Sequence, residues 1–364
     1  KKEKPRTKEK KPSKVKWGRI GIAAALLVLA AMVISMMTHV KITEDKKVAL
    51  NENYLSLGYE TVTKDMVRKI NRLKKLTDLS FRNCEFESGA LEALRLPENL
   101  QSFTISDCTG VDDLSCLTDA ENLRNLYLRN CGLTDDLIPN VKFANLRTAH
   151  LSGNPGVTDL GKIGEWANVT DLDVANTGIE DLDGLSCDGL MTLNFSGTGV
   201  SDVAPLAALS QLATIRGSDT NVTSLDSLAA LTELKTLEFN NCAITAVRTP
   251  FASLRLVHLS LENNGLTDIS GFENCTLLKT VQLAGNQISD ISFLSKNVQT
   301  LESLTLSGNP LMAEDLRFLI KCEGMKELEL DGIPLQNIDF VTSMYHLTRL
   351  SAVGCGLTDI SGIQ

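Results

Sequence analysis

The sequence has few of the residues, and none of the short motifs, on which catalysis usually depends. Aromatic residues make up 5% of the 364-residue chain, and it contains only four histidines. There is no GxGxxG, no GxxxxGK[ST], no HExxH, no GxSxG and no complete EF-hand loop. These absences argue against nucleotide-dependent, zinc-protease and serine-hydrolase chemistry. We therefore expect no enzymatic activity and no cofactor.

The cysteines do not form a metal-binding pattern either. Nine are present, but no CxxC pair occurs, and the closest two, Cys108 and Cys116, are eight positions apart. That spacing does not fit a zinc knuckle. An odd number of cysteines also fits poorly with a disulfide-bonded protein in an oxidising compartment.

What the sequence does contain is a repeat. An apolar residue opens the same short pattern thirteen times, at intervals of 21 to 24 residues. The opening residues are Leu76, Leu100, Leu123, Leu146, Val169, Leu190, Leu212, Leu234, Leu256, Leu278, Leu301, Met325 and Leu347. A unit this short cannot bury its apolar side alone, so neighbouring units must stack into an elongated array.

The unit that begins at Leu278 shows the pattern clearly. Its fourth and sixth positions, Val281 and Leu283, are apolar and alternate with polar residues, as in a half-buried strand. Asn286 follows at the ninth position, where the chain must turn and where an amide can both donate and accept hydrogen bonds. We expect the ninth positions to form a structural ladder of buried groups. Its members are Cys84, Cys108, Cys131, Asn154, Thr177, Thr198, Thr220, Cys242, Asn264, Asn286, Asn309 and Cys355, and Ile333 is the one member that has no side-chain donor.

This frame resembles the leucine-rich-repeat family, in particular the 22-residue class of bacterial internalin-like surface proteins. The resemblance covers residues 55–364, with 55–62 as a degenerate extra unit. It implies an α/β solenoid, a right-handed horseshoe with a parallel β-sheet on the concave side and 3₁₀ or extended chain on the convex side. Residues 41–75 would then form a linker and an N-terminal cap, which must cover the first apolar coil face. Residues 76–364 would hold about thirteen repeats, truncated at the C-terminus.

A basic segment and an apolar segment precede the repeats. Residues 1–19 carry ten Lys or Arg and two acids, which predicts a disordered cytoplasmic tail. Residues 20–40 are almost entirely apolar, and at 1.5 Å per residue one helix of this length, roughly 31 Å, would cross a bilayer. Trp17 lies where an aromatic side chain would anchor such a helix. An uncleaved transmembrane helix is favoured over a cleaved signal peptide, because the apolar core of a signal peptide is usually shorter.

The distribution of charge predicts a topology and excludes one class of partner. The basic residues before the apolar segment far outnumber Lys41, Lys46 and Lys47 just after it. This asymmetry predicts a single-pass protein of the cell membrane, with a cytoplasmic N-terminus and extracytoplasmic repeats. Residues 20–40 would then contact the lipid bilayer. The whole chain has a net charge of −9 although its first 19 residues are strongly basic, so the repeats are acidic and no nucleic-acid partner is expected.

The concave sheet is the candidate binding surface. One residue between the two apolar strand positions points outward, and these residues form a column along the sheet. Tyr127 is the only aromatic residue of this column, while Arg124 and Arg147 share a second column, where two adjacent cations favour an acidic partner. Asp173 is expected to orient His150 by a hydrogen bond. The alternative is a solvated face with its long side chains splayed apart. The candidate binding residues are Arg124, Tyr127, Arg129, Arg147, His150 and Asp173.

Two functions fit these features. In the first, a membrane-anchored extracytoplasmic module binds a protein or a glycan through its concave sheet, as a bacterial cell-surface protein. In the second, the array is the sensing or spacing ectodomain of a transmembrane signalling protein whose catalytic domain lies upstream of residue 1. The two functions differ in the segment expected before Lys1, since only the second requires a catalytic domain there. We expect sequence to be missing at both ends, since the chain does not begin with Met and stops within a repeat.

Overall fold

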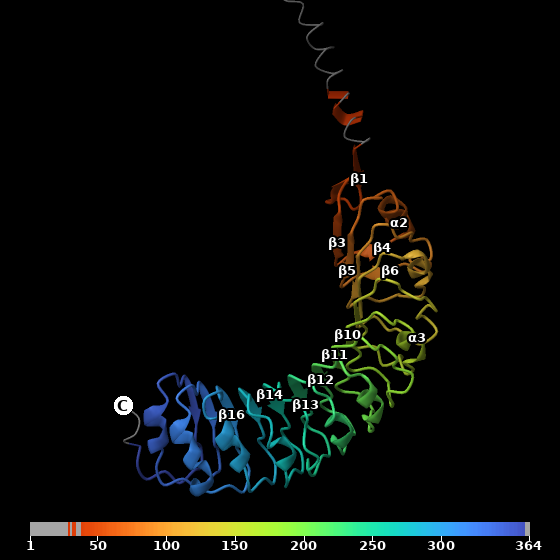
Figure 1. Cartoon of the computed structure of the whole chain (residues 1–364). Helices are drawn as coiled ribbons and strands as arrows, with labels where there is room; N and C mark the ends of the chain where they lie inside the picture. Colours follow the sequence, from red (N-terminus) through yellow and green to blue (C-terminus); the bar gives the residue numbers. More distant parts are fainter. Residues whose placement is uncertain (1–27, 30, 34–37, 361–364) are drawn as a thin grey trace, which may run out of the picture.

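The computed structural model describes residues 28–29, 31–33 and 38–360 (Figure 1). The strands are β1 (His39–Lys41), β2 (Lys47–Ala49), β3 (Tyr54–Gly58), β4 (Thr61–Val62), β5 (Asp78–Arg82), β6 (Glu85–Phe86), β7 (Ser102–Ser106), β8 (Asn125–Arg129), β9 (Thr148–His150), β10 (Asp171–Asp173), β11 (Thr192–Asn194), β12 (Thr214–Arg216), β13 (Thr236–Glu238), β14 (His258–Ser260), β15 (Thr280–Gln282), β16 (Ser303–Thr305), β17 (Glu327–Glu329) and β18 (Arg349–Ser351). The α-helices are α2 (Lys64–Ile70) and α3 (Gly161–Gly164), and the 3₁₀ helices are η1 (Ser115–Asp119), η2 (Ala204–Ala208), η3 (Asp226–Leu228), η4 (Ser270–Phe272), η5 (Ser292–Asn297), η6 (Ala313–Lys321) and η7 (Asp339–Ser343).

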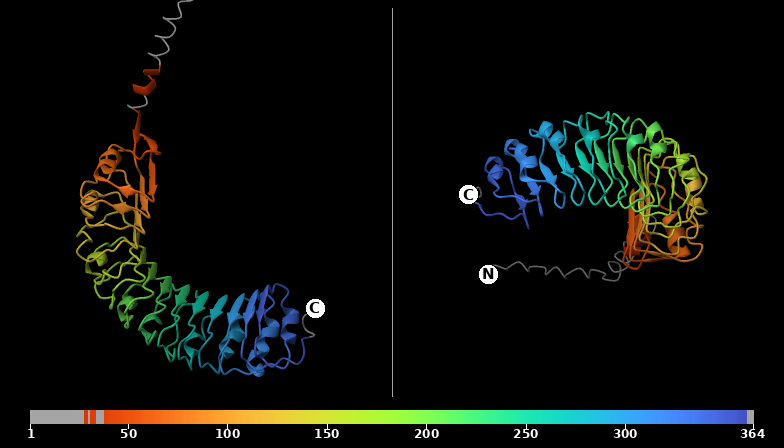
Figure 2. Two further views of the ribbon diagram at one scale, coloured as in Figure 1. Left: turned by 180° about the vertical axis from the view of Figure 1, so that it is seen from behind. Right: turned by 90° about the horizontal axis from the view of Figure 1, so that it is seen from below.

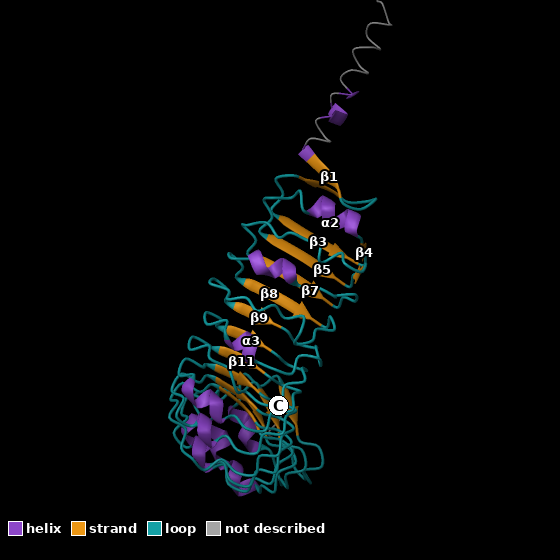
Figure 3. Ribbon diagram, turned by 90° about the vertical axis from the view of Figure 1, so that its right-hand side faces the viewer, coloured by secondary structure: helices purple, strands orange, loops and turns teal. Residues whose placement is uncertain are grey.

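One parallel sheet runs the length of the described molecule. It contains 14 strands in the order β3-β5-β7-β8, followed by β9 to β18 in sequence order. The sheet lines the inner side of a curved molecule, and the helical turns lie on its outer side (Figures 1 and 2). Figure 3 shows the strands stacked one above the other along the array. The predicted horseshoe with a concave parallel sheet is confirmed.

Alternation along each strand separates the core from the concave surface. In the unit from Leu278, Val281 and Leu283 are fully buried, whereas Gln282 between them lies on the concave face. Gln282 pairs in register with Ser260 on β14 and with Thr305 on β16. Because this register holds in every unit, the outward residues of all strands form one continuous column.

A polar side chain just before most outer turns accepts a hydrogen bond from a backbone amide at the start of that turn. Asp268 Oδ1 accepts from the Ser270 amide at 3.0 Å before η4, and Asp290 Oδ1 accepts from the Ser292 amide at 2.8 Å before η5. Short 3₁₀ helices of this kind recur on the convex side (Figure 2), as the resemblance to leucine-rich-repeat proteins implied.

The turn after each strand contains a residue in the left-handed backbone region. In the thirteen repeats it lies directly before the ladder position and is Gly, Asn or Asp, the residues that adopt a positive φ most easily, whereas after β3 it is Tyr59. Asn263, with φ 53°, precedes Asn264, and Gly285, with φ 69°, precedes Asn286. This conformation turns the chain away from the sheet and directs the next side chain inward.

The asparagines of the ladder connect neighbouring coils, where a coil is one repeat turn of the solenoid. Asn286 Nδ2 donates to the carbonyls of Leu261 and Leu283, both at 2.9 Å, and so spans two coils. Its Oδ1 accepts from the amides of Asn264 at 3.2 Å and Leu266 at 3.1 Å. One buried side chain therefore contacts four backbone groups. The two carbonyls also accept from Asn264 and Asn309, whereas the two amides depend on Asn286.

Threonine and cysteine make fewer contacts at the same position. Thr198 Oγ1 donates only within its own coil, to the Phe195 carbonyl at 2.6 Å. The Cys355 thiol donates to the Leu330 carbonyl of the preceding coil at 3.1 Å. Cys131 is buried, and burial raises its pKa to about 12, so its thiol stays protonated at neutral pH. Cys242 is only half-buried, unlike the other cysteines of the ladder.

The N-terminal end of the array contains an extra strand and a hairpin. β3 precedes the thirteen repeats and pairs in parallel with β5, at the place of the degenerate unit. β1 and β2 form an antiparallel hairpin in which Val40 pairs with Val48, and both side chains are buried. Helix α2 follows, with Thr63 Oγ1 accepting from the Met66 amide at its N-terminus.

These observations correct the predicted membrane topology. Most of the predicted transmembrane segment, residues 20–40, lies outside the described residues. Val40, at its end, belongs to a buried strand and not to a helix. Within residues 28–29, 31–33 and 38–360, no helix has the length and the apolar content needed to cross a bilayer. The single-pass topology and the cell-membrane localisation predicted from charge and hydropathy are therefore not supported.

Candidate functional site

The first strands of the sheet present a regular grid of side chains on the concave face. β5, β7 and β8 have five residues each and pair in register along their whole length. Their outward residues therefore form three rows across the sheet, about 4.8 Å apart from strand to strand. The rows are Asp78–Ser102–Asn125, Ser80–Thr104–Tyr127 and Arg82–Ser106–Arg129.

A hollow of about 330 Å³ lies over this grid and β3. Small hydroxyl-bearing residues cover its floor, whereas two tyrosines and two arginines are its largest lining side chains. Because Ser and Thr occupy the floor positions, the larger side chains stand above them and leave a concavity. The lining residues are Tyr54, Asp78, Leu79, Ser80, Arg82, Ser102, Thr104, Ser106, Tyr127 and Arg129.

Tyr127 and Arg129 are held in place by each other and by His150. The Arg129 guanidinium lies over the Tyr127 ring, with Cζ 5.1 Å from the ring centroid. The His150 ring meets Tyr127 edge-on at a centroid distance of 5.2 Å and an interplanar angle of 90°. Arg129 Nη2 also contacts His150 Nδ1. These contacts restrict both side chains before any ligand binds.

The carboxylate beside His150 is not the predicted one. His150 Nε2 lies 3.4 Å from Asp171 Oδ2, on the first outward position of β10. Asp173, two residues further along, accepts from the Ala175 amide at 3.1 Å and so stabilises its own turn. Asp173 lies opposite His150 in register, as the sequence indicated, but the histidine ring contacts Asp171, one outward position earlier on β10.

Arg124 and Arg147 lie beside the hollow and do not line it. They are adjacent, because the Arg147 amide donates to the Arg124 carbonyl at 2.8 Å, and both are exposed. Arg147 Nη1 donates to the Asn168 carbonyl at 2.9 Å. Of the six predicted residues, the structure brings Tyr127 and Arg129 into the hollow, places His150 behind them, and leaves the other three at its margin or on the next strands.

The sequence analysis missed Tyr54, Asp78 and Arg82. Tyr54 lies on the extra strand β3, outside the thirteen regular units, and 57% of its surface is exposed. Asp78 and Arg82 lie two positions before and two after the outward column that contains Ser80. The first four strands of the sheet, β3, β5, β7 and β8, have five residues instead of three, so they present additional outward positions.

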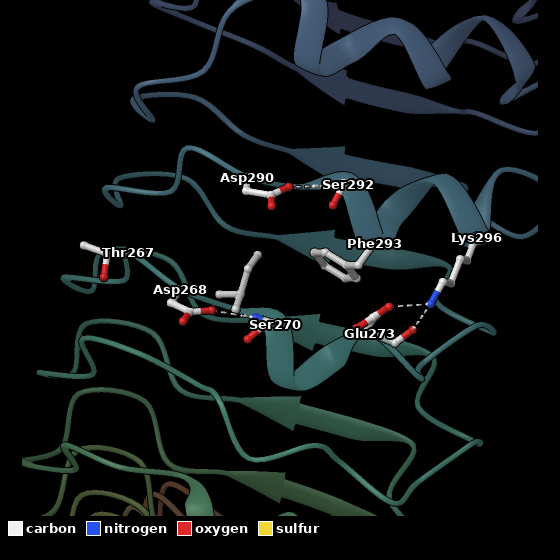
Figure 4. A pocket seen from close by; sticks show the side chains of 9 residues that line it. Thr267, Asp268, Ser270, Glu273, Asp290, Ser292, Phe293 and Lys296 are labelled. Atoms are coloured by element: carbon white, nitrogen blue, oxygen red, sulfur yellow. Dashed lines mark hydrogen bonds and ion pairs between the residues drawn. The ribbon is translucent and has the colours of Figure 1, made fainter.

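A second hollow, of about 550 Å³, lies on the outer side between η4 and η5 (Figure 4). Its polar groups already have partners within the protein. Glu273 pairs with Lys296 at 3.0 Å, and Asp290 accepts from the Ser292 amide. Asp268 accepts from the Ser270 amide and pairs with Arg248, and these contacts hold the pKa of its carboxyl below the usual value. Although larger, this hollow offers a ligand fewer unpaired groups than the concave one.

The part of the chain that the structure describes contains no cluster of His, Cys, Asp and Glu suited to a metal ion.

Comparison with known families agrees with this architecture. A family model described as Leucine Rich repeats (2 copies) matches residues 254–296, and a second, Leucine Rich Repeat, matches residues 122–143. The chain therefore contains leucine-rich repeats. A comparison with curated protein sequences gives no significant match.

Solved structures show that the fold of this chain is similar to that of internalins. An internalin, InlF of Listeria monocytogenes, is 24% identical with a TM-score of 0.72, and the alignment covers 84% of this chain and 89% of that one. The functional domain of InlJ from the same organism, which includes a cysteine ladder, is 18% identical with a TM-score of 0.64, covering 87% of this chain and 72% of that one. The plant peptide hormone receptor RGFR1, in complex with RGF2, is 17% identical with a TM-score of 0.59, covering 84% of this chain and 57% of that one.

Proposed function

We propose that this chain is a non-enzymatic binding module that holds an acidic segment of a partner protein against the concave face of β3 to β9. The observation that carries the proposal is the hollow in which Tyr54, Arg82, Tyr127 and Arg129 surround a floor of Ser and Thr side chains. Tyr and Arg contribute much of the binding energy at protein interfaces. The plant receptor of similar fold was solved with RGF2 bound, which supports a polypeptide ligand for this kind of scaffold.

The charge of this surface favours an acidic segment. Arg82, Arg124, Arg129 and Arg147 all lie in or beside the hollow, on a chain whose net charge is −9. No ion pair with a carboxylate is found for any of the four within the described residues. A local excess of positive charge on an acidic protein attracts an acidic ligand and repels a basic one.

Selection of peptides from a random display library against the whole chain tests this proposal. We expect the selected peptides to be rich in Asp and Glu and to bind less tightly as salt is raised. The double variant Tyr127→Ala with Arg147→Glu should weaken their binding at least about tenfold, since it removes an aromatic anchor and inverts one charge. Its melting midpoint should change little, because both side chains project from the sheet.

A matched control is available away from the sheet. Tyr345, 83% exposed, and Arg317, exposed on η6, allow the same pair of substitutions, Tyr345→Ala with Arg317→Glu. This control should bind the selected peptides like the unmodified chain. If the control loses binding while the Tyr127 and Arg147 variant keeps it, the concave site is wrong.

A further inference from the structure

Arg82 and Arg129, in the row Arg82–Ser106–Arg129, differ from the arginines on the later strands of the described concave face. Arg216 on β12 pairs with Glu238 of the next strand at 2.9 Å, and Arg349 on β18 pairs with Glu329 at 2.9 Å. These cations are neutralised by a neighbouring glutamate. Arg82 and Arg129 have Ser106 between them instead, and no carboxylate lies within ion-pair distance of either in the described residues.

The spacing of the two arginines suits a single bridging group. Their strands are separated by one strand, β7, so their backbones lie about 10 Å apart, and Ser106 is at the midpoint. Arg82, Ser106 and Arg129 line the same hollow, where Arg82 turns back to Ser80 and Arg129 turns back over Tyr127. Donors from both strands can therefore reach one group bound in the hollow between them. The Ser106 hydroxyl can supply a further donor from below.

Arg82 and Arg129 already make contacts within the protein, and these contacts set the direction of both side chains. Arg82 Nε donates to Ser80 Oγ at 3.2 Å, which leaves its terminal nitrogens available. Arg129 is fixed by Tyr127 and His150, while its Nε is buried and has no hydrogen-bond partner. Gly58, the next residue of the row on β3, adds no side chain that would cover Arg82.

We propose that Arg82, Ser106 and Arg129 form an anion subsite that binds one oxyanion group of the ligand, a carboxylate or a phosphate carried by an acidic segment. The inference rests on the proposed function. It places the main charged contact between protein and ligand at these three residues. Two guanidinium groups without an internal carboxylate, held on either side of a hydroxyl, form charge-assisted hydrogen bonds with such a group. Asp78 lies four residues back along the strand, about 13 Å away, and repels a second anion from that end of the hollow.

Titration of the isotopically labelled whole chain with inorganic phosphate, and separately with acetate, tests the subsite. The Nε–Hε NMR signals of Arg82 and Arg129 should shift in a saturable manner with at least one of the two anions at constant ionic strength. The anion that binds more tightly identifies the oxyanion class. Arg82→Gln should weaken this binding at least about tenfold, since one charge-assisted contact is lost. Arg317→Gln, the same charge change on the outer side, should leave it unaltered.

The inference is overturned if the Arg82 and Arg129 signals shift only linearly, like that of Arg317, with both anions. It is also overturned if Arg82→Gln binds phosphate and acetate like the unmodified chain. The proposed function is tested separately by the selected peptides. If they lose affinity with Tyr127→Ala and Arg147→Glu but not with Arg82→Gln, the concave module stands and only the anion subsite is wrong.

Discussion

Replacement of Gly217 by leucine is expected to destabilise the protein by about 3 kcal/mol, although almost every other repeat has a large apolar residue at this position. Phe195 and Phe239, in the coils on either side, both extend into the space that Gly217 leaves, and their rings meet at 5.9 Å. A Cβ on residue 217 would lie 2.5 Å from Phe195 Cζ and 2.5 Å from Phe239 Cε1. Both rings are fully buried, so neither can move aside without disturbing the core.

Urea unfolding of Gly217→Leu measures this effect, and a double-mutant cycle identifies its cause. Gly217→Leu should cost less in the background of Phe195→Leu with Phe239→Leu than in the unmodified chain, because the smaller side chains give the new leucine room. A gain in stability from Gly217→Leu alone would mean that the two rings do not share this space.

Asn286→Ala is the second substitution with a large expected effect. It removes the two donations to the Leu261 and Leu283 carbonyls and the two acceptances from the Asn264 and Leu266 amides. The two carbonyls keep Asn264 and Asn309 as donors, but the two amides lose their partner. Since a buried backbone group without a partner costs about 1–3 kcal/mol, we expect a loss of at least about 2 kcal/mol in the free energy of unfolding.

Thr198→Ala provides the comparison at the same ladder position. Thr198 donates one hydrogen bond, within its own coil, so its loss should be near 1 kcal/mol. Equal losses for the two variants, measured by urea unfolding under the same conditions, would show that the contacts of Asn286 between coils do not stabilise the array.

The period of the repeats was sufficient to predict the architecture because each coil repeats the same local rules. Alternation such as Val281–Gln282–Leu283 determines which side of a strand is buried, and the constant spacing brings equivalent residues into register. Deviations within single units were harder to predict. Gly217 looks like a defect in the pattern, and only the positions of two rings from other coils show that it is required.

The candidate site was predicted in part for the same reason. Tyr127 and Arg129 were found because they lie on or next to the regular outward column. Tyr54 was missed because it lies on a strand outside the regular units, and Arg82 because the first strands are longer than the repeat requires. Which aspartate contacts His150 depends on the directions of the Asp171 and Asp173 side chains. The spacing of the repeats does not determine these directions.

The membrane prediction was wrong for a different reason. It rested on the apolar residues 20–40 and on the excess of basic residues before them, which are evidence of hydropathy and charge only. The hairpin that contains Val40 depends on pairing with Val48, which no apolar run reveals.

Hydrogen–deuterium exchange of the whole chain, with and without a selected acidic peptide, tests the concave binding site most directly. Binding over the hollow should slow exchange in β5, β7 and β8, which line it, with little change in the outer turns η4 and η5. Slower exchange confined to η4 and η5, with β5, β7 and β8 unaffected, would place the ligand on the convex side and contradict the proposed function.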